Sequence, residues 1–474
     1  MNNRISARQL AFEVLEAVEF DDAYANLIMP KRLAKAGLEP RDGGFAQELA
    51  YGTLRWQLLY DEIIEFAAQR DLDTIDTKAL IVLRLGAHQL LELETPPHAA
   101  ISETVDLAKA VLPEKLIGFV NAVLRRISER TRNDWMQKVL AGLDDEVDRF
   151  AVRYSHPVWI VRSLKQALKL DGREAELEAL LAADNVQPKV SLVALPGLIG
   201  ADEISAKRAE AHNASPLGFT LESGDPARID AVQRGSARVQ DQGSQLVALA
   251  LSRSGNTGKQ EAWADFCAGP GGKAALLGAE ARLAGATLEC TEVSEHRTRL
   301  VKQALSAVVD AGANIKVRSG DSREIGDQTP NKFDRIMLDA PCSGLGALRR
   351  RPEARWRKSS RDIAELNRLQ LELLESAVAA AKVGGLVAYV TCSPHLAETT
   401  AIVDAALKRF PELELLDSNG VLSEINPELE LNRDRKTTQL WPHVHGTDAM
   451  FIALLRKGKA AKQAARQSNS KSAK

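Results

Sequence analysis

The chain contains very little cysteine, and this scarcity excludes several kinds of protein. Only four cysteines occur in 474 residues, at positions 267, 290, 342 and 392, and none lies in a Cys-x-x-Cys pair. A secreted disulfide framework, a dithiol redox site and a structural zinc site are therefore all disfavoured. We expect reduced thiols and no bound metal.

The sequence also lacks a secretory leader and a long uncharged apolar run. Residues 1–20 carry an arginine-containing amphipathic pattern instead of a charged segment followed by an apolar core. No apolar stretch is long enough to cross a bilayer. We therefore expect a cytoplasmic protein with no membrane partner.

An excess of charge of one sign is absent as well. The 62 basic and 64 acidic residues leave a formal net charge of −2, so nucleic-acid binding would have to rest on local patches. One basic patch comprises Arg349, Arg350, Arg351 and Arg355. The other is the tail at 459–474, which we expect to be a disordered, solubilising end.

The hydrophobic pattern divides the rest of the chain into segments. Residues 1–140 are predicted to be helical throughout, because apolar residues such as Ala11, Leu15 and Val18 recur at helical spacing. Residues 150–235 combine a helix with a β-branched apolar run, which predicts a small α/β or α+β connector, similar to an RRM. The helical front, this connector and the segment that follows it together predict about three domains.

Residues 236–458 show a different rhythm, in which strands alternate with helices. Strands separated by helices imply right-handed crossovers and a doubly wound parallel sheet. In such a sheet, ligands and chemistry collect at the carboxyl ends of the strands. The candidate strands are 262–267, 286–293, 315–318, 333–340 and 385–392, with helices such as 297–309 and 363–381 between them.

A glycine-rich loop, Cys267 to Lys273, follows the first of these strands and precedes a helix. Glycines let the backbone approach a ligand closely, and a helix N-terminus offers unpaired amides to an anionic group. The loop fits neither the dinucleotide nor the ATP phosphate fingerprint, so NAD and ATP are disfavoured. Glu292, Asp321 and Asp339 end the next three strands, where an acid would meet ribose hydroxyls. Together these residues predict a crevice for a nucleotide-like cofactor.

Cys342 and Cys392 each lie just beyond a predicted strand, and a serine follows each of them. A lone cysteine inside a strand is usually core packing, and we interpret Cys290 in that way. A position beyond the strand end instead favours a nucleophile, because turns into helices supply the amide dipoles that activate a thiol. Cys267, in the glycine loop, is predicted to contact the ligand.

His443 and His445 could indicate a metal or acid–base site. No third ligand accompanies them, so they predict a structural hairpin near the edge of the sheet.

These motifs together resemble the RNA cytosine-5 methyltransferases that use S-adenosylmethionine. Cys267–Lys273 resembles the cofactor loop of that family, Asp339–Ser343 its first cysteine motif and Thr391–Ser393 its second. The helical front resembles the antitermination factor NusB. The combination is similar to the family of bacterial 16S ribosomal RNA cytosine-5 methyltransferase B, the Fmu/Sun type, over nearly the whole chain except the tail. The NusB-like segments are Glu48–Arg55, Pro97–Glu103 and Phe119–Arg126.

The resemblance implies a domain order and a reaction. It implies an all-α NusB-like RNA-binding domain at 1–140, the connector at 150–235 and a Rossmann-like class I methyltransferase domain at 236–458. The implied enzyme transfers a methyl group from S-adenosyl-L-methionine to carbon 5 of a cytosine in 16S ribosomal RNA, through a cysteine adduct at carbon 6. We expect it to act as a monomer.

The resemblance also implies roles for individual residues. Cys392 would be the nucleophile and Cys342 would assist product release, while Asp339 would contact ring N3 and Lys273 would support nearby charge. Arg349, Arg350, Arg351 and Arg355 would hold RNA phosphates. The cofactor would be bound by Cys267, Ala268, Gly269, Pro270, Gly271, Gly272, Lys273, Glu292, Asp321 and Asp339.

The sequence departs from the family pattern in several places. Gly269 stands where alanine is usual, Glu292 stands where aspartate is usual, and the connector near Ser191–Ala194 lacks the familiar Arg-x-Asn strand. Three alternatives remain open. They are a transfer-RNA cytosine-5 methyltransferase, a DNA cytosine-5 methyltransferase that would use the Pro-Cys thiol, and a NusB-like RNA-binding module without activity.

Overall fold

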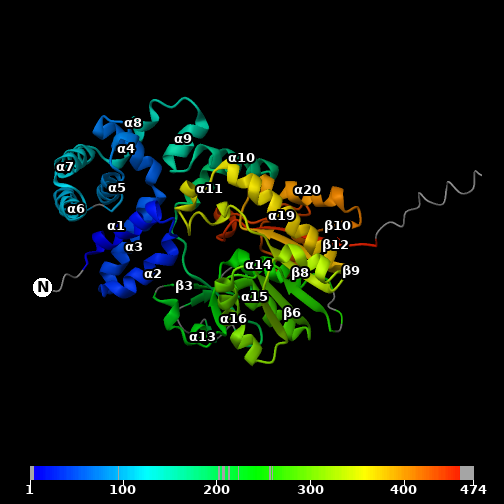
Figure 1. Cartoon of the computed structure of the whole chain (residues 1–474). Coiled ribbons are helices and arrows are strands. Elements are labelled where there is room, and N and C mark those ends of the chain that lie inside the picture. Colours follow the sequence, from blue (N-terminus) through cyan, green and yellow to red (C-terminus); the bar gives the residue numbers. More distant parts are fainter. Residues whose placement is uncertain are drawn as a thin grey trace, which may run out of the picture. The chain divides into compact units, whose positions relative to one another are not determined.

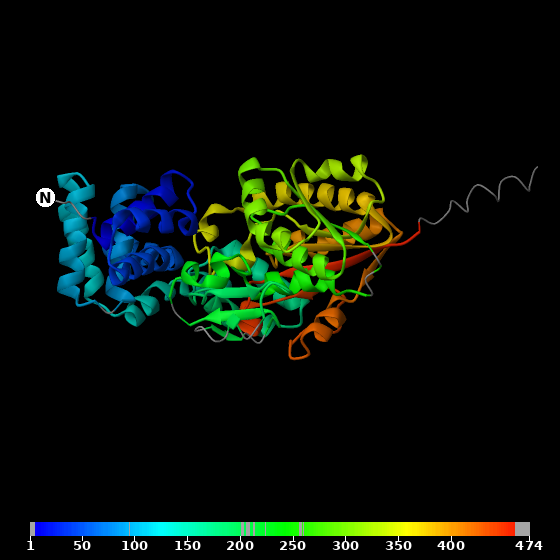
Figure 2. The same ribbon diagram turned by 90° about the horizontal axis from the view of Figure 1, so that it is seen from below.

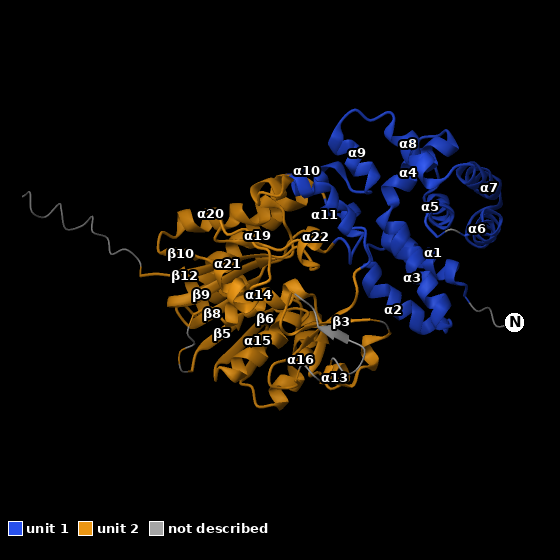
Figure 3. Cartoon of the chain, turned by 180° about the vertical axis from the view of Figure 1, so that it is seen from behind, with its two compact units in different colours: residues 1–165, 175–187, 348–358 blue, residues 166–174, 188–347, 359–474 orange. Residues whose placement is uncertain are grey.

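The structure is a computed structural model that describes residues 5–93, 95–200, 203–204, 209–211, 214–222, 224–255, 258 and 260–459. The predicted disordered tail lies outside the described residues from position 460 onward. The chain divides into two compact units (Figure 3). Unit 1 comprises 1–165, 175–187 and 348–358, and unit 2 comprises 166–174, 188–347 and 359–474. The division into four segments at the boundaries given above stays a prediction.

Unit 1 is helical in the residues described, as its apolar spacing predicted (blue to cyan in Figure 2). Ser6 and Thr131 accept hydrogen bonds from first-turn amides of the helices that they precede, and Pro97 opens a helix in the first turn, where proline is tolerated. Its elements are α1 (Ala7–Phe20), α2 (Ala25–Ala36), α3 (Pro40–Arg55), α4 (Gln57–Ala68), η1 (Leu72–Thr74), α5 (Thr77–Leu91), α6 (Pro97–Val111), α7 (Glu114–Ser128), α8 (Arg132–Leu140), α9 (Glu146–Arg153), α11 (Leu177–Ala183) and α18 (Ala354–Arg357), with α10 (Val158–Leu170) and η2 (Glu174–Glu176) at the division.

Amphipathic faces build the core of unit 1. Ala11 and Leu15 of α1 are buried in one hydrophobic cluster with Leu49 of α3 and Leu83 of α5. Burial of such a stripe, and not helix propensity alone, supplies most of the stability of these helices.

The segment 348–358 belongs to unit 1, although the chain before and after it belongs to unit 2. The Arg355 guanidinium is fully buried and donates to the carbonyl oxygens of Arg55 at 2.9 Å, Ser155 at 3.0 Å and Asp184 at 2.9 Å. Trp356 donates from its indole nitrogen to the carbonyl oxygen of Leu54 at 3.0 Å. Because α3 ends at Arg55 and α11 ends at Ala183, these donors satisfy carbonyls that a helix end leaves unpaired.

This burial corrects one expectation. Arg355 was predicted to hold RNA phosphates, but its side chain is fully enclosed within unit 1 and its Nη1 and Nη2 atoms donate to backbone carbonyls. The sequence pattern of a basic cluster cannot distinguish an arginine that faces solvent from one that caps buried helix ends.

Unit 2 contains a large sheet with the strand order β10-β12-β9-β8-β5-β6-β7, and β11 pairs with β12. The predicted parallel order is confirmed for β5 to β9, whereas β12 runs antiparallel to both β9 and β10, so the sheet is mixed. The bounds are β5 (Ala262–Asp265), β6 (Thr287–Glu292), β7 (Ile315–Ser319), β8 (Phe333–Asp339), β9 (Ala381–Thr391), β10 (Leu413–Leu416), β11 (Thr438–Gln439) and β12 (Phe451–Lys457).

Helices cover both faces of this sheet (Figure 1). On one side lie α14 (Gln242–Ser252), α15 (Gly272–Leu283) and α16 (Glu295–Asp310), and on the other lie α19 (Ser360–Ala380) and α20 (Thr400–Arg409). Successive residues of β8 therefore alternate between two cores, with Met337 in one and Ile336 and Leu338 in the other. The short elements of this part are η4 (Ser322–Glu324), α17 (Ile325–Gln328), η5 (Leu345–Ala347), η6 (Leu396–Glu398), α21 (Ser418–Ile425) and α22 (Pro442–His445).

A smaller antiparallel sheet precedes the large one in unit 2. Its order is β2-β3-β1-β4, formed by β1 (Ser191–Ala194), β2 (Ala209–Ala211), β3 (Gly218–Leu221) and β4 (Ala237–Val239), and η3 (Pro226–Arg228) and α13 (Asp230–Gln233) connect β3 to β4. A four-stranded sheet is the framework of RRM modules, which agrees with the small mixed connector expected from the sequence.

Replacing Arg355 with methionine tests the buried anchor of unit 1. The substitution leaves three carbonyl oxygens without their donor, and each buried unpaired group costs about 1–3 kcal/mol, so the free energy of unfolding should fall by about 3 kcal/mol or more. Urea unfolding followed by the helical circular dichroism signal measures the loss. The exposed Arg351→Met is the matched control, with an expected change within about 0.5 kcal/mol. Equal effects of the two substitutions would contradict the assignment.

Candidate active site

The predicted site residues gather at one edge of the large sheet. β5 to β9 run parallel, so their carboxyl ends face the same way. The glycine loop follows β5, Glu292 ends β6, Asp321 follows β7, Asp339 ends β8 and Cys392 follows β9. This is the edge at which open α/β sheets bind ligands.

The turn from the glycine loop into α15 requires a glycine. Gly271 has a φ of +110°, and a Cβ at this position would lie 2.4 Å from the Cβ of Ala304 on α16. No side chain caps the N-terminus of α15. Its first-turn amides are therefore the kind of donors that hold an anionic group at a helix start.

Glu292 fastens the glycine loop to the end of β6. Its buried carboxylate accepts from the amides of Gly269 and Ser294, each at 3.0 Å, and lies 3.3 Å from the Arg297 guanidinium. Arg297 in turn donates to the carbonyl oxygen of Gly269 at 2.7 Å. A Cβ at position 269 would lie 2.3 Å from the Glu292 carboxylate. The two departures from the family pattern, glycine at 269 and glutamate at 292, therefore compete for the same space. The longer acid fits because residue 269 has no side chain.

A group of charges lies between the glycine loop and β8. Lys273 donates from Nζ to Oδ2 of Asp339 at 2.9 Å. Asp265, at the end of β5, is 1% exposed, and its carboxylate makes no hydrogen bond of good geometry with the part of the chain that is described. Burial first, and then the charge of Asp339, raise the pKa of Asp265 to about 7, against the opposing effect of Lys273. A buried carboxylate whose oxygens lack hydrogen bonds of good geometry is suited to a polar or cationic ligand group.

The two predicted catalytic cysteines are adjacent. Cys342 Sγ and Cys392 Sγ lie 3.4 Å apart without a disulfide, and both side chains are partly buried. A hydrogen bond with Cys392 and burial raise the pKa of Cys342 well above its ordinary value. Burial lowers the pKa of Lys273, but the negative charges of Asp339 and Cys392 outweigh this effect and raise it. The ammonium of Lys273 is therefore retained beside Cys392.

Gly346 permits the close approach of the two cysteine loops. Its amide donates to the carbonyl oxygen of Cys392 at 2.9 Å, and its own carbonyl accepts from the amide of Ala449 at 2.8 Å. A Cβ at this position would lie 2.1 Å from the Ala449 carbonyl oxygen. A side chain here would push the loops apart.

Glu398, which the sequence analysis did not find, joins the same two loops. It is fully buried, and it accepts from the Ser343 amide at 2.7 Å, the Ser393 hydroxyl at 2.7 Å and the Gln370 amide group at 3.2 Å. The Ser343 hydroxyl also donates to it. Asp265 was missed as well, although its place at a strand end was a visible signal. No sequence signal identified Glu398, because its contact with Ser343 spans 55 positions.

The predicted RNA-binding arginines do not belong to the unit that contains this edge. They belong to unit 1, where Arg349 is largely buried, Arg350 is partly exposed and Arg351 is exposed. Cys290 is buried inside β6, in agreement with its interpretation as core packing. Burial raises the pKa of Cys267 well above its ordinary value, so this residue is held as a thiol.

The histidines near β11 have structural contacts. His445 is held by the backbone of Trp441 and by the carbonyl oxygen of Glu430, within the helical turn α22 that connects β11 to β12. Over the described ranges, no cluster of three or more His, Cys, Asp or Glu side chains is arranged to hold a metal ion. Within the same ranges, no helix has the length and apolar character of a membrane span.

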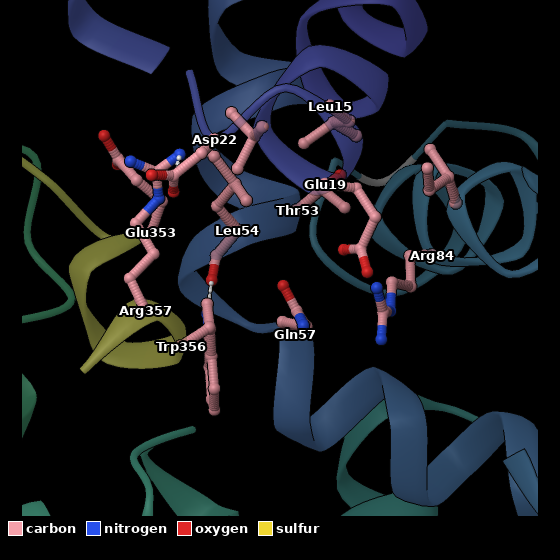
Figure 4. A pocket seen from close by; sticks show the side chains of 12 residues that line it. Leu15, Glu19, Asp22, Thr53, Leu54, Gln57, Arg84, Glu353, Trp356 and Arg357 are labelled. Carbon is pink, nitrogen blue, oxygen red and sulfur yellow. Dashed lines mark hydrogen bonds and ion pairs between the residues drawn. The ribbon is translucent and has the colours of Figure 1, made fainter. Parts of the chain in front are cut away.

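Unit 1 contains a separate cavity of about 190 Å³ (Figure 4). Leu15, Thr53 and Gln57 line it from the N-terminal helices, and Glu353 and Trp356 line it from the segment at 348–358. None of the residues predicted for catalysis or cofactor binding lines this cavity. It is a feature of the helical unit.

Both the helical N-terminal part and the C-terminal α/β part of the chain match known protein families. Residues 255–456 match the family model of the 16S rRNA methyltransferase RsmB/F, and residues 5–129 match the NusB family. A Mycobacterium tuberculosis protein, whose name classes it as a methyltransferase, is 44% identical over 95% of this chain and 96% of its own length. The ribosomal RNA small subunit methyltransferase B of Pseudomonas putida is 33% identical, covering 89% of this chain and 93% of that protein.

A solved structure agrees with the fold. The crystal structure of PH0851 superposes with a TM-score of 0.76, at 21% identity, over 96% of this chain and 98% of that chain.

The shared space of Gly269 and Glu292 leads to a double-mutant prediction. Gly269→Ala alone should lower the free energy of unfolding by about 1–3 kcal/mol, because the added methyl group meets a buried carboxylate. Glu292→Asp alone should also destabilise, because the shorter acid moves away from the Gly269 and Ser294 amides. Combined, the substitutions should recover about 1 kcal/mol or more relative to their sum, measured by urea unfolding. Strictly additive losses would show that the two positions are independent.

Proposed function

Because this chain belongs to the family of ribosomal RNA small subunit methyltransferase B, in which a NusB domain precedes an RsmB/F methyltransferase domain, we propose that it methylates carbon 5 of a cytosine in 16S ribosomal RNA. The methyl donor in this proposal is S-adenosyl-L-methionine. The observation that carries the proposal is the 3.4 Å approach of Cys342 and Cys392 at the ligand-binding edge of the sheet, beside the Lys273–Asp339 pair.

The residues around the glycine loop fit this cofactor. S-adenosylmethionine carries a cationic sulfonium and an ammonium group, and the buried Asp265 carboxylate is a suitable partner for such a charge. We assign Glu292, at the end of β6, to the ribose hydroxyls, because its carboxylate oxygens have further acceptor capacity beyond the amides that they bind. Asp321 is held in place by Arg323, which lowers the pKa of Asp321. When bound, the cofactor supplies an electrophilic methyl group.

The chemistry requires a nucleophile because carbon 5 of cytosine does not attack a sulfonium methyl unaided. In the proposed reaction, the Cys392 thiolate adds to carbon 6 and thereby makes carbon 5 reactive. Asp339 donates or shares a proton at ring N3 as negative charge develops there, oriented by Lys273. Loss of the carbon 5 proton then expels Cys392, a step that we assign to the help of Cys342.

The target base must be accessible on both faces, so it must be unstacked or lie in a loop when it reacts. We propose that Arg350 and Arg351 contact the surrounding phosphates, since both retain exposure to solvent. Arg355 is left out because of its burial.

Two competing readings are less well supported. A DNA-type enzyme would use Cys342 as the nucleophile, whereas the Lys273 ammonium interacts with Cys392. A transfer-RNA methyltransferase would have no evident use for a NusB domain, which residues 5–129 match.

Replacing each of the two cysteines with alanine should change the reaction in a different way. Cys392→Ala should reduce methyl transfer by roughly a thousandfold or more, because it removes the sulfur that we assign to the attack on carbon 6. Cys342→Ala should instead accumulate a covalent protein–RNA complex that survives denaturing electrophoresis, because adduct formation continues while release slows. A normal methylation rate in Cys392→Ala would refute the assignment.

The substrate class is tested in cells. Bisulfite sequencing of ribosomal and transfer RNA from a deletion strain should show one 16S cytosine that becomes unprotected, with transfer RNA unchanged. Complementation with wild type should restore the protection, and complementation with Cys392→Ala should not. Loss of a transfer-RNA signal with an intact 16S pattern would support the alternative substrate.

A further inference from the structure

The two cysteines have nearly the same local setting, so their different roles require an explanation. Each follows a parallel strand and is followed by a serine, and their sulfurs are 3.4 Å apart. Two thiols at this distance resist carrying a negative charge at the same time, because like charges disfavour ionisation. When the pair carries a single negative charge, the two sulfurs share one proton, and its position decides which sulfur is nucleophilic.

The buried Glu398 carboxylate lies close to the loops that carry the two cysteines. Its hydrogen-bond partners are the neutral amide and hydroxyl of Ser343, the hydroxyl of Ser393 and the amide of Gln370. It holds Ser343 through two donors and Ser393 through one. The carboxylate is thus tied more closely to the loop of Cys342, and its charge contributes to the raised pKa of that cysteine.

Lys273 supplies a positive charge that interacts with the other cysteine, Cys392. It is bound to Asp339 at 2.9 Å, and its charge interacts with Cys392. An ammonium beside a thiol stabilises the thiolate. The Glu398 carboxylate therefore acts on Cys342, and the Lys273 ammonium acts on Cys392.

We propose that Glu398 is a positioning residue that keeps the shared proton on Cys342, so that Cys392, next to Lys273, carries the thiolate. In this state the Cys342 thiol donates a hydrogen bond to the Cys392 sulfur across the 3.4 Å gap. The inference rests on the proposed function in one point, the identity of Cys392 as nucleophile. It adds the residue that distinguishes two otherwise similar thiols.

The test uses full-length protein with neither RNA nor methyl donor. Both cysteines are partly exposed, so iodoacetamide can label them, and peptide mass spectrometry gives a separate rate for each. In wild type, labelling of Cys392 should rise at a lower pH than labelling of Cys342. In Glu398→Gln, which removes the charge but keeps the shape, the Cys392-to-Cys342 rate ratio at neutral pH should fall by roughly tenfold, equivalent to a relative pKa change of about one unit.

Matched variants separate charge from packing. Glu398→Asp retains the charge and should restore much of the wild-type ratio, whereas Glu424→Gln, at an exposed position on α21, should leave the ratio unchanged. Thermal unfolding establishes that each variant is folded. If Glu398→Gln does not fold, the pH profiles of wild type still decide, because labelling of Cys342 at the lower pH would overturn the proposal.

An unchanged ratio in folded Glu398→Gln would overturn it as well. Labelling requires no methyl transfer, so its result is independent of the proposed function. Normal methylation by Cys392→Ala would refute the proposed function and leave the labelling result as a separate fact about the thiol pair.

Discussion

The parallel pairing of β8 with β9 is the constraint on which the rest of this site depends. Their register continues to the pair Asp339 and Val390, so the two chains leave the sheet side by side and carry Cys342 and Cys392 to within 3.4 Å. Gly346 and Glu398 then close the two loops on each other through backbone and carboxylate hydrogen bonds. Reactive groups far apart in sequence are thus brought together by strand pairing.

Buried carboxylates order the loops at this edge of the sheet. Asp265, Glu292 and Glu398 are all nearly inaccessible to solvent, where an ionised group is costly unless hydrogen bonds or opposite charges compensate it. Glu292 and Glu398 are compensated by donors from loops that they hold together, whereas Asp265 has no such donor of good geometry. The same carboxylates therefore order the loops and leave one acidic position for a cationic ligand.

Much of this architecture was predictable from local pattern. The strand–helix alternation predicted β5 to β9 because buried parallel strands are short apolar runs, and strand-end positions identified Glu292, Asp339 and both cysteines. The antiparallel β12 was not predicted, since its pairing with β9 depends on residues some sixty positions earlier in the chain. Arg355 and Glu398 were misjudged or missed for the same reason: their partners are known only once distant segments have folded together.

The central claim is that Cys392 forms the bond to the pyrimidine, and RNA containing 5-fluorocytosine tests it most directly. Fluorine at carbon 5 cannot leave as a cation, so the adduct should persist after methyl transfer, and peptide mapping should locate the RNA on the peptide that contains Cys392. Attachment to the Cys342 peptide, or a methylated product with no covalent complex at all, would contradict the account.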